Sequence, residues 1–409
     1  MKTEIHEYLE KKKLLQKKLL DFVENDANIQ DEFKHLIPIF KEQKIPEDKC
    51  EFHNFLCLIS MISENHHRNT NFLKNIEHIL LYFADDMKNN FSNLDIFKIF
   101  RPNKRIVFFL IQNKMIIIDK TITSFFEPIY EKCPKYCLYI VEMGQFLSNK
   151  YEIDSKIMKY PKNEFNKLRE IGENNKYICE LIRKDLIDDF IEYTNDCNIS
   201  LDTKIKFSTF DTNNFLEIYD VSLIKYAAFF GSFKIFKYLF TNIKYKEFPW
   251  KYAIHGKNME ILHFLKQYDS KLDDDYLSES IRCHHLDITN YFLQNEISDH
   301  VLISSILSYN YFYFPNEDKL IDNVFFYYLC EKNYSYLVSI ILKNNQSNDN
   351  FDINENCLLH RVIMNRSNDV AKLLINNPKI EINLQNQREE TPLFVASNNL
   401  NTEIVEHLL

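Results

Sequence analysis

The residues of this chain whose types could do chemistry are clustered histidines and cysteines. The densest clusters are His66-His67 and Cys283-His284-His285. Neighbouring residues on a helix point about 100° apart, so neither cluster can chelate one ion as an i, i+4 pair would. Either cluster could supply a single ligand, or the two could meet in space. We expect both to be packing and capping residues at the ends of helical hairpins.

Three further groups invite a binding or catalytic interpretation. Cys133 and Cys137 are four residues apart and could share one helical face, but no second cysteine pair at zinc spacing lies near them. The acidic runs Asp185–Asp189 and Asp273–Asp275 could bind a cation or form a carboxylate pair. Acidic residues at hairpin edges are usually hydrated, or favour a helix N-terminus. We therefore expect structural thiols and hydrated or capping carboxylates, and we expect His255 to cap a helix.

Signatures of known enzyme classes are missing. The sequence has no glycine-rich phosphate loop, no G-x-S-x-G elbow, no HExxH and no kinase-type HRD followed by DFG. Only four glycines occur, so few backbone sites can approach a phosphate closely. We expect a protein that is not an enzyme, with no catalytic residues, no cofactor and no metal ligands. A metal-dependent switch or an uncharacterised enzyme in the N-terminal and middle helical region stays open as the alternative.

The stretch Ser222–Phe240, SLIKYAAFFGSFKIFKYLF, indicates the elements that would position such groups. Short apolar runs flank Gly231 at helical spacing, which predicts two brief helices joined at a residue with positive φ. Such a hairpin cannot bury its own apolar face, so it implies neighbours of the same kind. Because glycines are few, we expect asparagine pairs to supply many turns, at Asn344-Asn345, Asn376-Asn377 and Asn398-Asn399.

Similar hairpins recur along the chain. Copies that start at Val324, Cys357 and Thr391 are 33 and 34 residues apart, and their expected breaks fall at Asn333, Arg366 and Leu400. A spacing of about 33 residues is the ankyrin period. Weaker and less evenly spaced copies start at Glu173, Phe248 and Asp275.

The last copy, TPLFVASNNLNTEIVEHLL, resembles the ankyrin signature. Thr391 can satisfy free N–H groups of the first helical turn, and Pro392 at the first helical position loses no hydrogen bond. Phe394 stands where the ankyrin pattern has histidine, whereas the preceding copy keeps it as His360. That histidine is usually structural in the family, so the resemblance implies that His360 packs and binds no ligand.

Seven short motifs occur in a fixed order along nearly the whole chain. They are NHHR (65–68), FSNLDIFKIFRPNKRI (91–106), REIGEN (169–174), ICELIRKD (178–185), YAAFFGS (226–232), YAIHGKN (252–258) and SIRCHH (280–285). This ordered set resembles a large family of protist ankyrin proteins known from trichomonads, in which a helical domain of unknown function precedes ankyrin repeats. The family has no known catalytic residues, so the resemblance transfers none.

Composition and charge exclude several classes. The net charge of −9 argues against a nucleic-acid surface, and no apolar run approaches the roughly 20 residues that span a bilayer. Glu4, Glu7 and Glu10 stand where a signal peptide would be apolar. The amphipathic segment 1–40 could lie on a membrane surface, but its mixed charges favour an ordinary helix. Nine scattered cysteines fit reduced thiols in the cytoplasm.

We therefore predict an all-α solenoid of helical hairpins, with degenerate and then regular ankyrin repeats. The predicted domains are an N-terminal helical domain (1–167), degenerate repeats (168–299), an irregular insertion (300–322) and regular repeats (323–409). The last repeat ends at Leu408-Leu409 without a polar cap. The chain is therefore expected to self-associate there, or to be a fragment of a longer ankyrin protein.

The predicted function is that of a non-catalytic protein-binding scaffold or adaptor with a protein partner of unknown identity. Stacked repeats expose an extended concave face, and a mixed-sign, amide-rich face suits a polar partner. The residues placed on this face by the repeat template are Asn354, Glu355, Arg361, Asn365, Gln385, Asn386, Gln387, Arg388, Glu389 and Asn398.

Overall fold

Two compact units make up the chain. The first combines Met1–Asp21, Gln30–Leu58 and Asn295–Leu409, and the second combines Phe22–Ile29 with Ile59–Gln294. The computed structural model describes residues 1–25, 29–65, 71–130, 136, 139, 140, 142, 161–217, 221–243, 248–269, 273–293, 297–344 and 358–409.

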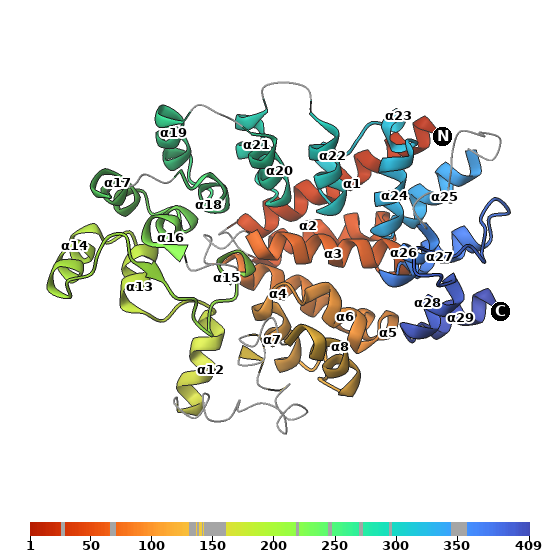
Figure 1. Ribbon diagram of the computed structural model, residues 1–409, viewed down its shortest axis with the longest axis horizontal. Helices are drawn as coiled ribbons and strands as arrows, with labels where there is room; N and C mark the ends of the chain where they lie inside the picture. Colours follow the sequence, from red (N-terminus) through yellow and green to blue (C-terminus); the bar gives the residue numbers. More distant parts are fainter. Residues whose placement is uncertain are drawn as a thin grey trace. The chain divides into compact units, whose positions relative to one another are not determined.

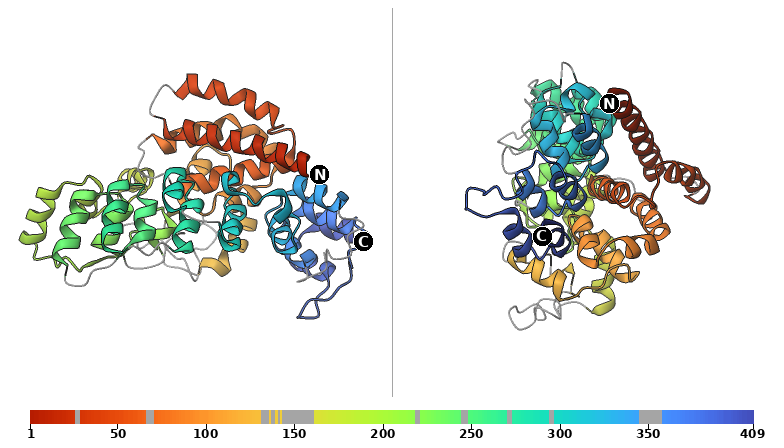
Figure 2. Two further views of the ribbon diagram at one scale, coloured as in Figure 1. Left: turned by 90° about the horizontal axis from the view of Figure 1, so that it is seen from above. Right: turned by 90° about the vertical axis from the view of Figure 1, so that its right-hand side faces the viewer.

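Helical hairpins stack in the second unit. Inner helix α13 packs on α16, α16 on α18 and α18 on α20, while outer helix α14 packs on α17 and α17 on α19. Figures 1 and 2 show these pairs, coloured yellow-green to teal, as successive hairpins in one row. The helices of this unit are α4 (Phe72–Tyr82), α5 (Ala84–Asn90), α6 (Asn93–Phe100), α7 (Lys104–Gln112), α8 (Lys120–Tyr130), α12 (Lys162–Ile171), α13 (Tyr177–Arg183), α14 (Ile187–Asp196), α15 (Asn214–Glu217), α16 (Leu223–Phe229), α17 (Phe233–Asn242), α18 (Trp250–His255), α19 (Met259–Tyr268), α20 (Asp274–Arg282) and α21 (Leu286–Phe292).

The first unit contains a second stack of the same design. Inner helices α22, α24, α26 and α28 pack on one another in order, and so do outer helices α25, α27 and α29. Three N-terminal helices, α1, α2 and α3, also belong to this unit. For α1 the unit includes the residues up to Asp21, and for α3 it includes the residues up to Leu58. The helices are α1 (Lys2–Glu24), α2 (Ile29–Glu42), α3 (Lys49–Asn65), α22 (Asp299–Leu307), α23 (Glu317–Leu320), α24 (Asn323–Glu331), α25 (Ser335–Asn344), α26 (Leu358–Met364), α27 (Asn368–Ile375), α28 (Pro392–Asn398), α29 (Thr402–Leu408) and the 3-10 helix η2 (Tyr311–Tyr313).

β-Strands are nearly absent from the described residues. The one strand pair joins β1 (Lys204–Ile205) to β2 (Val221–Ser222), antiparallel, with Lys204 opposite Ser222. The predicted all-α fold of stacked helical hairpins is therefore confirmed.

Four turns within the hairpins lie at the breaks that the sequence predicts. Each turn has one left-handed residue, and the expected breaks at Gly231, Asn333, Arg366 and Leu400 are all confirmed. Most of these residues carry a Cβ, which costs roughly 1–2 kcal/mol in this conformation, so packing between hairpins must offset the cost. The left-handed turn residues of the described hairpins are Asp185, Gly231, Lys257, His284, Tyr309, Asn333, Arg366 and Leu400, with φ between 45° and 66°.

The expectation that asparagine pairs form left-handed turns is wrong for the described pairs. Asn376 and Asn399 have φ of −78° and −85°. Asparagines near helix ends instead use their side-chain amides: Asn399 Nδ2 donates to the carbonyl of Val395 at 2.9 Å, and Asn344 Nδ2 donates to that of Ile340 at 2.7 Å. The Val395 carbonyl also accepts the backbone N–H of Asn399 at 3.1 Å, so the side-chain amide adds a second bond at the end of the helix.

The residue after each left-handed turn often reaches back to the preceding hairpin. Ser232 Oγ donates to the carbonyl of Ile182 at 2.5 Å, and Asn258 Nδ2 donates to that of Gly231 at 2.7 Å. In the first unit, Ser367 Oγ donates to the carbonyl of Glu331 at 2.9 Å. Side-chain hydrogen bonds at the turns therefore link hairpins whose apolar faces already pack together.

Two expectations differ in detail from the structure. The copy starting at Glu173 does form a hairpin, α13–α14, but its turn residue is Asp185, three positions later than the template places it. The segment 300–322, expected to be irregular, contains most of α22 and all of η2 and α23. Its inner helix α22 has the usual left-handed turn at Tyr309, and η2 and α23 follow in place of a full outer helix.

Gly256 is required by close packing between hairpins. Its φ of −69° is ordinary, and the turn of this hairpin is made by Lys257 instead. A Cβ at position 256 would lie 2.1 Å from the carbonyl oxygen of Ala228 in the preceding hairpin. This oxygen belongs to the backbone, so no flexible side chain could move aside to make room. The neighbouring hairpin therefore leaves no room for a side chain at position 256, and only glycine fits there.

We predict that Gly256→Ala lowers the free energy of unfolding by about 1–3 kcal/mol or more, because overpacking forces two backbones apart. Chemical denaturation monitored by circular dichroism measures the loss. Glu260→Ala on α19 of the same hairpin, where the side chain is exposed and the close approach is unchanged, serves as the control. Unchanged stability of Gly256→Ala would contradict the packing shown here.

Candidate protein-binding face

Local capping positions the inner helices of the last repeats as the sequence predicts. Thr391 Oγ1 accepts a hydrogen bond from the N–H of Phe394 at 3.3 Å, and Pro392 occupies the first turn of α28. The apolar positions Val395, Ala396 and Ile404 are buried. The Thr–Pro opening thus starts α28 by the expected mechanism.

The connection between α27 and α28 is held by one asparagine. Asn386 Oδ1 accepts hydrogen bonds from the N–H groups of Arg388 (2.9 Å) and Glu390 (3.0 Å), and Asn386 Nδ2 donates to Glu390 Oε2 at 2.9 Å. Glu389 adopts a left-handed conformation with φ of 61°. The amide of Asn386 is therefore used in shaping the loop, whereas the side chains around it point outward.

His360 fastens this loop to the preceding repeat. The side chain is buried, and its Nε2–H donates to the carbonyl of Glu390 at 2.9 Å, directly before Thr391. His360 therefore packs between two repeats, as the sequence predicts. Phe394, which occupies the same repeat position in the next copy, is 54% exposed.

The described residues of the predicted face lie at the surface. Arg361 and Asn398 are exposed on the inner helices α26 and α28, and Asn365 is exposed directly after α26. Gln385, Gln387, Arg388 and Glu389 are exposed on the loop, while Asn386 is half-buried. Arg361 also lies beside Tyr327 of the preceding repeat, where burial raises the pKa of the phenol and Arg361 lowers it. Asn354 and Glu355 lie outside the described residues.

The N-terminal helices contact the opposite edge of the same repeats. Asn54 Nδ2 on α3 donates to the carbonyl of Asn333, the left-handed turn residue between α24 and α25, at 3.4 Å. The ring of Tyr8 on α1 stacks on Tyr336 of α25, with centroids 4.8 Å apart. Turns within hairpins and loops between hairpins lie at opposite ends of the helices, so these two contacts lie away from the loop edge.

A buried glutamine anchors α1 to the repeat that lacks a full outer helix. Gln16 Nε2 donates to Asn310 Oδ1 at 2.9 Å, and Gln16 Oε1 accepts from the N–H of Tyr311 at 2.8 Å. Nearby, the buried Lys12 forms an ion pair with Glu51. Sequence reasoning missed this docking because the partners are separated by nearly 300 residues.

The other groups considered from the sequence have mostly structural positions. Asp185 accepts from the N–H groups of Lys234 (3.1 Å) and Ile235 (3.0 Å), so it caps α17 of the next hairpin. Asp273 caps its own helix α20 through the N–H of Asp275 at 3.2 Å. The buried His284 is a left-handed turn residue, and the buried His285 precedes α21. His66, His67, Cys133 and Cys137 lie outside the described residues.

Comparison with known proteins identifies the repeats. Residues 326–409 match the profile of a family described as ankyrin repeats in three copies. The C-terminal hairpins are ankyrin repeats. No curated protein matches the chain. Among the described residues, no helix combines the length and the apolarity that crossing a membrane demands.

We predict that His360→Leu destabilises the ankyrin repeats by about 0.5–1.5 kcal/mol, because the carbonyl of Glu390 loses one of its two donors and keeps only the N–H of Asn386. Phe394→Leu is the matched control at the same repeat position, where the side chain is exposed, and should change stability by less than about 0.5 kcal/mol. Urea denaturation of both variants gives the comparison. Equal effects would show that the His360 hydrogen bond contributes nothing.

Proposed function

We propose that this chain is a non-catalytic scaffold or adaptor that binds a protein partner through the exposed loop and inner-helix face of its ankyrin repeats. Ankyrin repeats mediate binding between proteins. The partner-binding residues of the proposal are Arg361, Asn365, Gln385, Gln387, Arg388, Glu389 and Asn398, with Asn386 as the residue that shapes the loop.

The observation that carries the proposal is a loop that is both ordered and exposed. Its backbone is fixed by Asn386 and fastened by His360, so little conformational entropy is lost when a partner binds. The adjacent Arg388 and Glu389 form no ion pair within the described residues, which leaves both charges available to a polar partner. A positive and a negative charge side by side favour a partner with the complementary charge pattern and disfavour partners that place like charges opposite them.

The proposal extends to two finer points that rest on sequence. The order of the seven motifs supports membership of the protist ankyrin family with an N-terminal helical domain. The odd number of cysteines within helical patterns supports a cytoplasmic protein with reduced thiols.

We predict that reversing Arg388 and Glu389 together, with Arg388→Glu and Glu389→Arg, weakens binding of the partner at least about tenfold. Affinity purification of full-length chain with mass spectrometry identifies partners, and titration with the purified partner gives the dissociation constants. The matched control reverses Lys343 and Glu406, which are exposed on the outer helices α25 and α29.

Two results would contradict the proposal. One is that both double variants bind the partner as tightly as the unmodified chain, which would place the interface elsewhere. The other is that the control variant alone loses binding, which would assign the interface to the outer helices.

A second copy of the chain is the other candidate partner, because the last repeat also exposes apolar side chains. Phe394 is 54% exposed and Leu400 is 80% exposed. Sedimentation velocity over a concentration series tests this possibility. A dimer that dissociates on Leu400→Lys would favour self-association, whereas a monomer at all concentrations would favour a different protein.

A further inference from the structure

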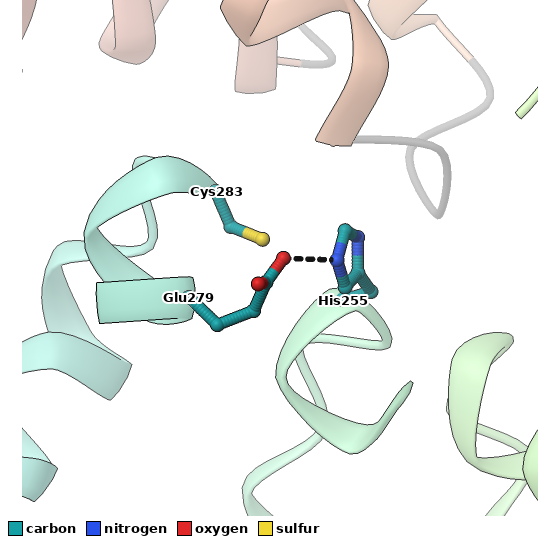
Figure 3. Close-up of side chains that lie close together, drawn as sticks. All are labelled: His255, Glu279 and Cys283. Carbon is teal, nitrogen blue, oxygen red and sulfur yellow. Dashed lines mark hydrogen bonds and ion pairs between the residues drawn. The ribbon is translucent and has the colours of Figure 1, made fainter. Parts of the chain in front are cut away.

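Three potential metal ligands meet in the second unit, on two neighbouring inner helices. His255 is the last residue of α18, whereas Glu279 lies on α20 and Cys283 directly follows it. Glu279 and Cys283 are four residues apart, so they share one face of the helix. Figure 3 shows the carboxylate and the thiol of these two residues directed to the same place as the imidazole of His255.

The distances suit a single ion. One ligand atom from each residue lies within 4.8 Å of the others, and His255 Nε2 is 2.8 Å from Glu279 Oε1. Tetrahedral zinc with bonds of about 2.0–2.3 Å separates its ligand atoms by roughly 3.3–3.8 Å. The observed spread includes that range, so changes in side-chain torsion are enough to admit the ion.

All three side chains are buried, and their surroundings hold them in place. The ring of Phe215 stacks on His255 with centroids 4.1 Å apart. On the other side, Cys283 Sγ lies 3.7 Å from Asn65 Oδ1, and Asn65 Nδ2 donates to the carbonyl of Arg282 at 3.4 Å. An amide oxygen is therefore next to the thiol and could fill a fourth coordination position.

The charges of the cluster also favour a divalent cation. A divalent ion bound to one carboxylate, one thiolate and a neutral imidazole gives a site with no net charge, which lowers the cost of burial.

We propose that His255, Glu279 and Cys283 form a zinc site that joins two successive hairpins of the second unit. Zinc would bind His255 through Nε2, Glu279 through Oε1 and Cys283 through Sγ. The Sγ–H bond breaks as the S–Zn bond forms, and the proton leaves to solvent. The proton that His255 Nε2 donates to Glu279 without the metal moves to Nδ1, so the imidazole binds zinc in its neutral form, and no group is oxidised or reduced. A thiolate in the ligand set selects zinc over magnesium or calcium.

The test uses the full-length chain after removal of metals by a chelator. We expect it to retain about one zinc per chain after desalting, to release protons on binding and to melt at a higher temperature with zinc bound. Cobalt(II) in place of zinc should give the near-ultraviolet absorption of a thiolate–cobalt bond. Retention of less than about a tenth of an equivalent of zinc would overturn the proposal.

Variants assign the site to these residues. Cys283→Ser should weaken zinc binding at least about 100-fold and abolish the thiolate–cobalt band. Mutating a residue that only hydrogen-bonds to a metal ligand typically lowers metal affinity 10–100-fold, and removing the ligand itself should cost more. Cys330→Ser is the matched control, because Cys330 is also fully buried but lies outside the cluster; its zinc affinity should stay within about twofold. An unchanged band and affinity in Cys283→Ser would show that the metal is held elsewhere.

A second variant guards against misfolding of Cys283→Ser. Glu279→Gln keeps the shape of the side chain and can still bond to His255, but it removes the anionic ligand. We expect at least about tenfold weaker zinc binding with the thiolate–cobalt band retained. Zinc affinity equal to that of the unmodified chain would contradict the proposed role of Glu279.

Discussion

Burial of the apolar face of one hairpin against the next is the constraint on which the rest of this structure depends. A hairpin such as α16–α17 buries Ala227, Ala228, Ile235 and Phe236 completely or nearly so, and it can do so only because α13, α14, α18 and α19 lie on either side. The left-handed turns with Cβ-bearing residues and the close approach at Gly256 are local costs that this packing must offset.

Polar groups in the stack act mainly between hairpins. Asp185 caps the helix of its neighbour, Ser232 and Ser367 bond to carbonyls of the hairpin before them, and His360 holds the loop that leads to the next repeat. Because these bonds join successive units, each also fixes the register between them. The same bonding fixes the exposed loop at 385–389, so its shape is set before any partner arrives.

In the first unit, the two edges of the repeat stack differ. N-terminal helices contact the turn edge through Gln16, Asn54 and Tyr8, whereas the loop edge keeps its charged and amide side chains exposed. The charges therefore lie where a partner could reach them. The cluster of His255, Glu279 and Cys283 in the second unit is different in kind, because its ligand atoms face one another in a buried space between two hairpins.

Features that depend on neighbours along the chain were determined by the sequence alone. Helix periodicity, the turns at Gly231, Asn333, Arg366 and Leu400, and the cap at Thr391 all follow from residues within one hairpin. The ankyrin assignment of the last repeats could be predicted for the same reason, since its signature occupies consecutive positions.

Features that join distant segments were decided only by the tertiary structure. The docking of Gln16 on Asn310, the clash that reserves position 256 for glycine, and the meeting of His255 with Cys283 each depend on which hairpins become neighbours and at what register. The i, i+4 spacing of Glu279 and Cys283 is visible in the sequence, but the third ligand comes from another hairpin. Helical periodicity fixes which face of a helix a residue occupies, whereas the packing of side chains fixes what that face meets.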